Sequence, residues 1–327
     1  MTKTQKYIII IGGVLALFVF SQFQKSTTDL PNSVGDPLEL VIVKNSEHFN
    51  PKFYKTLKNY LTVDIGPSPQ NENVLSILQV EKSKFTSILK RHQNLLFVSK
   101  SDTFSIILKK NLFAQNQAVI LIECPSHELL KSKKPQIIAL VDKIKEIEIK
   151  RLIKNFSRYL NKQIQKQIQK THNISLSLPQ DFFLAYSDSS VTWARRETPK
   201  VSQGVLIINV NHSPKERPTP NSIVGYIDSI TKTHVEGPIK NSYMASEELA
   251  PIFLDTIRIK NYSALKIQSL WRMENDFMGG VYVSYYFDGI LNKNPLIIHT
   301  YLYAPDERKN ISLLQLESIA HSMEKLK

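Results

Sequence analysis

Three charged residues at alternate positions are the part of this chain best suited to chemistry. Arg272, Glu274 and Asp276 lie at i, i+2 and i+4, so on an extended strand all three side chains point to one face. A guanidinium can bind a carboxylate or a phosphate through two parallel hydrogen bonds. One interpretation is therefore a ligand cleft, in which Gly279 and Gly280 let the backbone come close to the ligand.

The same segment has a second, purely structural interpretation. An arginine–carboxylate network can fasten a hairpin while Trp271, Phe277 and Met278 fill the core. Trp271 and Trp193 are the only two tryptophans, and each lies one or two residues before an arginine. This arrangement fits a shared pocket and fits equally well a core with a polar rim, so both interpretations stay open.

Two further arginines could complete a cleft. Arg195 and Arg196 are adjacent, and neighbouring residues of a strand point to opposite faces, so at most one of them lines a given groove. We expect that one to act together with Arg272. The candidate ligand-binding set is therefore Arg195, Arg196, Trp271, Arg272, Glu274 and Asp276.

Few other residues offer a catalytic arrangement. Cys124 and His127 lie where an apolar run meets a helical pattern, and a cysteine near a helix N-terminus can have a lowered pKa. A free thiol that ends an apolar strand, however, usually packs as a small hydrophobe. The eight histidines are scattered, without metal-site spacing, and the chain has no phosphate-binding glycine motif. We predict no catalytic residue, metal site or cofactor, and a non-enzymatic protein is favoured.

The charge of the chain is uneven. Its formal net charge is +13. Residues 1–172 hold 26 basic and 13 acidic side chains, whereas residues 173–327 hold 16 of each. Such asymmetry could indicate an anionic partner such as phospholipid headgroups, an acidic glycan or nucleic acid. The alternative is a solvated, lysine-rich helix face.

The N-terminus carries the strongest targeting signal. Tyr7–Phe23 is a run of 17 residues with Ser21 and Gln22 as its only strongly polar members, preceded by Lys3 and Lys6. A helix of that length spans about 25 Å, slightly less than the hydrocarbon core of a bilayer. A retained signal-anchor in residues 1–25 is favoured over a cleaved signal, because no small-residue cleavage pattern follows. A buried hydrophobic helix is the third possibility.

The rest of the chain divides into two halves. Residues 26–37 form a tether, residues 38–172 a first α+β half that ends in a long basic helix from about Ser126, and residues 173–327 a second half of mostly antiparallel strands. Short apolar strand patterns flanked by a few helices favour an α+β fold over a doubly wound parallel sheet. We therefore expect two α/β-sandwich-like halves joined by a long basic helix, after an N-terminal membrane helix.

Several segments resemble a family of bacterial envelope lipoproteins known as domain of unknown function 4837. The segment Leu270–Gly280, with Tyr303-Ala304-Pro305 after it, is the most specific. The other segments that carry the resemblance are Leu30–Gly35, Arg151–Lys154, Trp193–Pro199 and Ser242–Met244. The resemblance extends over residues 30–327 and implies an exported, membrane-attached protein without a known activity. Members usually carry a lipidated cysteine after the signal, whereas this chain has Ser21 and Gln22 there.

These observations together predict an exported protein. We expect a membrane-anchored protein of the cell envelope, with its body in the periplasm and its N-terminal helix in the membrane, which acts as a non-enzymatic binding or structural module. Its partner would be an envelope protein, a glycan or an anionic lipid, and not nucleic acid. The alternative is an enzyme acting on envelope carbohydrate or lipid in a cleft around Arg272, Glu274 and Asp276.

Overall fold

The structure of the protein is a computed structural model that describes residues 30–210, 218–291 and 294–326. The predicted signal-anchor lies outside these residues. Among the helices within them, none is long and apolar enough to cross a membrane. The described residues form two compact units: residues 30–55 with 77–132, and residues 56–76 with 133–326. Seven α-helices and three sheets make this a mixed architecture, which agrees with the predicted α+β class.

The first unit is built on a five-stranded sheet. Its strands are β1 (Glu39–Lys44), β2 (Ser76–Glu81), β3 (Asn94–Lys100), β4 (Ser105–Lys110) and β5 (Ala118–Cys124), in the order β2-β1-β3-β5-β4. β1, β3 and β5 run parallel, and β4 is antiparallel to β5. The three parallel strands are the most apolar segments of this half, as expected for strands covered on both faces.

Helices are short in the first unit. α2 spans Pro51–Leu61, and residues 82–92 form the 3₁₀ turn η1 (Lys82–Lys84) and α3 (Ser87–Lys90) in place of one continuous helix. The interruption has a local cause, because the Thr86 hydroxyl caps the backbone N–H of Leu89 and starts a new helix. The side chain between them, Phe85, packs edge-on against Phe97.

The segment predicted to form one long basic helix consists of three helices. They are α4 (His127–Ser132), α5 (Lys134–Arg158) and α6 (Lys162–His172). Asn161 explains the second break: its side chain accepts the N–H of Ile164 at 3.1 Å as an N-cap and donates to the backbone oxygen of Phe182 at 2.7 Å. The prediction of one continuous helix is therefore wrong, because a contact with a distant residue ends it.

The second unit is built on an eight-stranded antiparallel sheet. Its strand order is β10-β12-β13-β14-β9-β8-β7, and β11 also pairs with β12. The strands are β7 (Phe183–Ser187), β8 (Val191–Glu197), β9 (Ser202–Asn209), β10 (Tyr243–Ser246), β11 (Phe253–Ile259), β12 (Tyr262–Glu274), β13 (Gly279–Leu291) and β14 (Asn294–Tyr303). β7 and β8 pair antiparallel as a hairpin across residues 188–190, in agreement with the predicted antiparallel strands of the second half.

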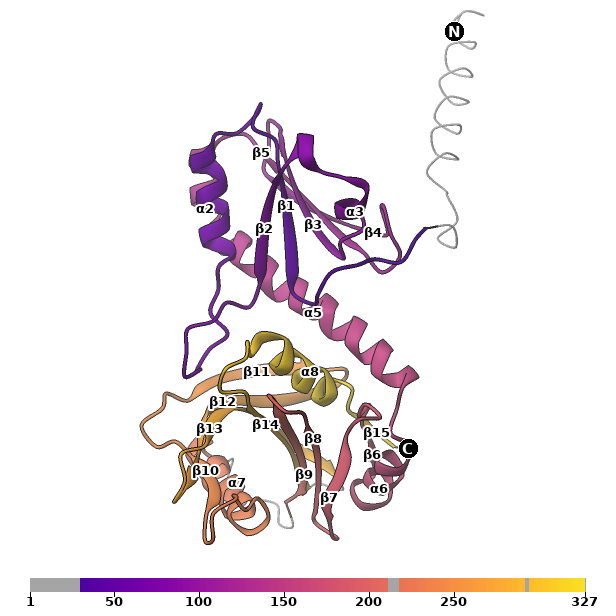
Figure 1. The fold of residues 1–327 in the computed structure, drawn as a ribbon, viewed down its shortest axis with the longest axis vertical. Helices are drawn as coiled ribbons and strands as arrows, with labels where there is room; N and C mark the ends of the chain where they lie inside the picture. The colour runs from indigo at the N-terminus through magenta and orange to yellow at the C-terminus, as the bar shows by residue number, and fades with distance from the viewer. Residues whose placement is uncertain (1–29, 211–217, 292–293, 327) are drawn as a thin grey trace, which may run out of the picture. The chain divides into compact units, whose positions relative to one another are not determined.

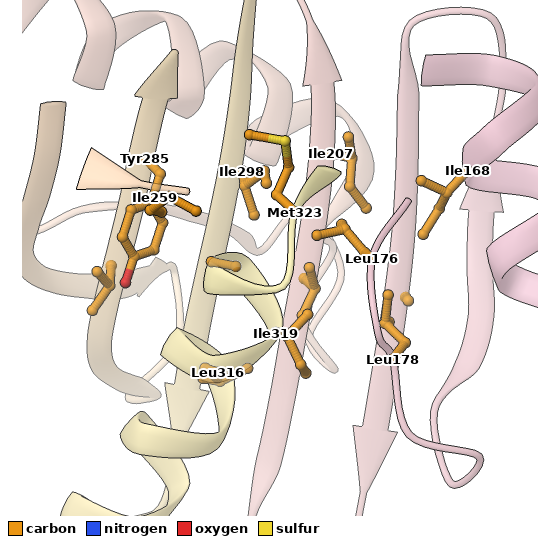
Figure 2. Packing of buried hydrophobic residues seen from close by; sticks show 14 of the residues in the cluster. Ile168, Leu176, Leu178, Ile207, Ile259, Tyr285, Ile298, Leu316, Ile319 and Met323 are labelled. Atoms are coloured by element: carbon orange, nitrogen blue, oxygen red, sulfur yellow. The ribbon is translucent and has the colours of Figure 1, made fainter. Parts of the chain in front are cut away.

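Helices cover both faces of this sheet. Figure 1 shows the sheet curving around α7 (Pro220–His234), with α8 (Asn310–His321) against the opposite face. The α8 face also receives α6 and the small pair of β6 (Ile174–Ser175) with β15 (Glu324–Lys325). Figure 2 shows this core, in which Leu316, Ile319 and Met323 lie against strand residues such as Ile207 and Ile298. Each central strand is therefore buried on both faces.

The second unit also contains residues 56–76, which extend from within α2 to the first residue of β2. Lys309 binds Glu72 through its side chain at 3.1 Å and through its backbone N–H at 2.7 Å, and the Asn310 amide donates to the Val74 oxygen at 3.2 Å. The two units thus have boundaries at residues 55/56, 76/77 and 132/133, whereas the predicted division placed one boundary at 172/173.

Candidate functional site

The hairpin that joins β12 to β13 carries the central candidate residues. β12 ends at Glu274 and β13 begins at Gly279. Asn275 has a left-handed backbone with φ of 61°, and the Met273 N–H donates to the Met278 oxygen across the turn at 2.7 Å. The alternation of strand faces therefore ends at Glu274, and Asp276 lies in the turn.

Arg272 is paired within its own sheet. Its Nε and Nη2 donate to Glu274 Oε1 at 2.8 and 2.5 Å, and its Nη1 donates to Glu247 Oε1 at 3.2 Å. Donation of these hydrogen bonds to the Glu274 carboxylate raises the pKa of the Arg272 guanidinium, which stays charged. Asp276 takes no part, because its Oδ1 accepts the N–H of Phe277 at 2.7 Å. The structure thus joins Arg272 to two carboxylates, one of which, Glu247, was not among the predicted residues.

The two glycines serve the packing of strands. A Cβ on Gly280 would lie 2.0 Å from the Leu302 oxygen, and one on Gly279 would lie 3.0 Å from the Trp271 oxygen. The Trp271 Nε1 donates to the same Leu302 oxygen at 3.2 Å. The close backbone approach permitted by these glycines is therefore used for β14 and β12.

Both tryptophans contact one tyrosine. Trp193 Nε1 donates to the Tyr301 hydroxyl at 3.2 Å, and the Trp271 ring stands edge-on to the Tyr301 ring at 5.9 Å and 73°. All three belong to the cluster that faces α7. Gly204 makes room for Tyr301, since a Cβ there would lie 2.0 Å from the tyrosine ring. The two tryptophans therefore share a buried aromatic environment with a hydrogen bond for each indole.

The arginines of β8 and β12 lie apart. Arg195 stacks over the Trp193 ring at 5.0 Å and pairs with Glu197, while Arg196 pairs with Asp181 at 2.8 Å. Strands β13, β14 and β9 separate β12 from β8. Four strand spacings correspond to roughly 19 Å along the sheet. Arg272 and Arg196 are therefore too distant to bind one carboxylate together, and Arg195 projects to the other face.

A group of charged residues that the sequence did not indicate lies under α8. Glu317 is 3% exposed and binds Lys145 Nζ of α5 at 2.6 Å and Lys266 Nζ of β12 at 2.5 Å. We call Lys145, Lys266 and Glu317 the buried charge cluster. Burial alone would raise the pKa of the Glu317 carboxyl, but the two ammonium groups outweigh it and hold that pKa well below its ordinary range.

Two further titratable side chains adjoin this cluster. The rings of Tyr285 and His321 meet edge-on at 5.8 Å and 88°. Burial raises the pKa of the Tyr285 hydroxyl and lowers that of His321 to about 4, so both are neutral at pH 7. The cluster residues are more than fifty positions apart in the sequence, so no local pattern could have identified them. Chemically, the arrangement is an ion-paired clamp between two helices and a strand.

The cysteine has the properties of a core residue. Cys124 is fully buried at the end of β5, and its Sγ lies 3.2 Å from the Ser126 oxygen. Burial raises the pKa of its thiol, which is therefore protonated at pH 7. The His127 ring lies 6.0 Å from the Phe53 ring. Within residues 30–210, 218–291 and 294–326, no group of three or more His, Cys, Asp or Glu side chains could hold a metal ion.

Two family models match the chain in succession. Residues 161–322 match Domain of unknown function (DUF4837), and residues 33–157 match Domain of unknown function (DUF8532). The resemblance seen in the sequence is thus confirmed over residues 161–322. The segments Leu30–Gly35 and Arg151–Lys154, which also seemed to fit that family, lie outside this match. The two matches meet where α5 gives way to α6. No curated protein matches the chain.

Solved structures show a weak similarity. The Ran-binding protein Mog1p of Saccharomyces cerevisiae is similar with a TM-score of 0.33 and 7% identity, over 47% of this chain and 91% of that chain. A mutant of Mog1 is similar with a TM-score of 0.32 and 7% identity, over 47% of this chain and 92% of that one. Similarities with TM-scores this low support no statement about fold or function.

Proposed function

We propose that this protein, whose residues 161–322 match the DUF4837 family model, is a non-enzymatic binding module of the cell envelope. Residues 1–25 hold it at a membrane. The apolar run of Tyr7–Phe23 with Lys3 and Lys6 before it supports the membrane attachment. The body is then exported. Its partner is an envelope protein that contributes an extended segment to the edge of the antiparallel sheet.

The pairing of the candidate cleft residues disfavours an enzymatic function. Arg272 is already bound to Glu274 and Glu247, and Asp276 points elsewhere in the turn. An arginine that must bind substrate would have to exchange these charge-assisted hydrogen bonds for new ones. The same pairing removes the support for an enzyme that acts on envelope carbohydrate or lipid around these residues. The arginine–carboxylate pairing and the buried Trp271 therefore fit the structural interpretation of the segment better, but the expectation that Phe277 fills the core is wrong, because its side chain is fully exposed in the turn.

One observation carries the binding role: β11 exposes apolar side chains at the edge of the sheet. Phe253 and Leu254 are adjacent, so they point to opposite faces, and yet they are 53% and 49% exposed. Leu249 and Ile252, in the segment before β11, are exposed as well. Among the described strands, β11 pairs with β12 alone. Such an edge offers a row of backbone groups and apolar contacts on both faces to an added strand.

The apolar part of this contact is appreciable. Burying a fully exposed Phe or Leu side chain stabilises by about 1.5–3 kcal/mol, so half-exposed Phe253 and Leu254 would add about 2 kcal/mol in total. The backbone hydrogen bonds of the added strand would supply the rest. Leu254→Lys would remove one of these apolar contacts and place a further charge beside the added strand, which disfavours strand addition.

The test is photocrosslinking in intact cells. A photoreactive amino acid replaces Phe253 in the full-length chain, and a matched control replaces Ile88, which is 68% exposed in the first unit. We expect one discrete adduct from position 253, lost when Leu254→Lys is added, and none from position 88. Equal adducts at both positions, or an adduct that survives Leu254→Lys, would refute an edge-strand partner. A C-terminal reporter that proves cytosolic would refute export separately.

A further inference from the structure

Two consecutive helices of the second unit each carry a row of positive charges that form no ion pair with the described residues. Lys150, Lys154 and Arg158 recur every four residues on α5, and Lys162, Lys166 and Lys170 recur every four residues on α6. All six are exposed. We call these six residues the basic ridge. A separation of four residues places side chains on one helix face, about 6 Å apart along the axis.

Packing of the opposite face fixes which way the ridge points. Ile164, Ile168 and His172 of α6 are buried against the sheet. Lys166 is two residues from Ile164 and from Ile168, which is about 200° around the helix, so the lysines lie opposite the buried face. On α5, Phe156 is buried between the exposed Lys154 and Arg158 in the same way. The ridge therefore faces outward on both helices.

No acidic side chain balances the ridge. Residues 149–180 contain no Asp or Glu, and none of the six ridge residues forms an ion pair within the described parts of the chain. Arg151 differs, since it binds the buried Glu148 at 2.8 Å. Like charges four residues apart repel one another on a helix. Anionic groups bound at the surface would relieve this repulsion along each helix.

We propose that the basic ridge docks the body onto the anionic headgroups of the bilayer in which the chain is tethered. This goes beyond the proposed protein partner, which binds at β11. Charge complementarity and the apolar run of residues 7–23 in the same chain favour a bilayer over other polyanions. Tyr159, which is 64% exposed between the two helices, is a residue type enriched at membrane interfaces.

The expected strength follows from the number of charges. Each basic residue near an anionic surface strengthens docking about fivefold, and salt screens the effect within a Debye length. Removing the three lysines of α6 should therefore shift the docked-to-free ratio about a hundredfold. Removing three lysines from elsewhere in the chain should leave that ratio unchanged.

The test uses the full-length chain in vesicles. A fluorophore is attached at Tyr159→Cys, since the native Cys124 is buried, and spin-labelled lipid headgroups quench it on docking. The vesicles contain phosphatidylcholine alone or with phosphatidylglycerol. The ridge variant carries Lys162→Gln, Lys166→Gln and Lys170→Gln. The matched control carries Lys82→Gln, Lys109→Gln and Lys110→Gln, which are exposed lysines of the first unit.

We expect quenching only with phosphatidylglycerol, lost in high salt and in the ridge variant but kept in the control. Equal quenching in neutral vesicles, or equal loss in both variants, would overturn the proposal. Binding of an RNA oligonucleotide without docking to vesicles would assign the ridge to nucleic acid instead. Flotation with neutral vesicles reports the tether alone, so failure of the membrane attachment is distinguishable from failure of the ridge.

Discussion

Replacing Glu317 by glutamine tests how the two helices are held on the sheet. Glu317→Gln keeps the size of the side chain but removes the charge that Lys145 and Lys266 face. Two ammonium groups would then remain without their counter-ion in a largely buried site. Removing one partner of a buried ion pair costs about 3–5 kcal/mol, because the other charge is left uncompensated. We expect a loss within that range in the free energy of unfolding of the second unit.

Tryptophan fluorescence measures this loss selectively. Trp193 and Trp271 are the only tryptophans, and both lie in the second unit. Denaturant unfolding at pH 7 followed by their emission therefore gives the midpoint and slope for that unit. The matched control is Glu146→Gln, which removes an exposed pair with Lys143 on α5. An exposed pair contributes about 0–1 kcal/mol.

Equal effects of the two substitutions would refute the role of Glu317. If Glu317→Gln and Glu146→Gln shift the midpoint equally, Glu317 is not clamping α5 and α8, and its burial is incidental. A second variant separates charge from packing. Replacing Lys145, Lys266 and Glu317 together by apolar residues of similar size should restore most of the stability, because well-packed apolar groups often match a buried ion cluster.

Two further predictions concern pH and glycine. Burial lowers the pKa of His172 and His321 to about 4, below the ordinary value near 6.5. The unfolded chain therefore binds more protons than the folded one between these values, so stability should fall as pH drops from about 6.5 to about 4. Unfolding midpoints measured across this window should decline less steeply in His172→Gln, and an unchanged slope would contradict the burial argument. Gly204→Ala should destabilise the second unit by about 1–3 kcal/mol, because its Cβ would meet the Tyr301 ring. Gly225→Ala, on α7 with no atom within 4 Å of the added Cβ, should instead stabilise by about 1 kcal/mol. The same fluorescence assay checks both, and a loss of equal size at the two positions would show that steric overlap is not the cause.

The local pattern of the sequence was sufficient for the predicted strand-rich α+β class. The short apolar runs of β1, β3 and β5 form strands because their side chains must leave water. α7 also begins as its residues indicate, with Thr219 accepting the N–H of Ser222 and Pro220 in the first turn. These features depend on neighbours within a few residues.

The candidate site depended on more distant contacts. Arg272 and Glu274 pair as the strand period predicts, but the left-handed Asn275 removes Asp276 from their face. The arginines of β8 and β12 seemed able to converge until the strand order placed three strands between them. Strand order follows from which edges and faces pair in three dimensions, and the spacing of residues within one segment does not encode it.

The sequence by itself determined the charge of the chain, the apolar run near its start, and the four-residue spacing of the basic ridge. Only the tertiary structure decided that the long helix breaks at Asn161 and that Glu317 lies between Lys145 and Lys266. The physical reason is the range of the interactions. Periodicity and composition act between neighbours, whereas caps and buried ion pairs form between groups that folding alone brings within hydrogen-bonding distance.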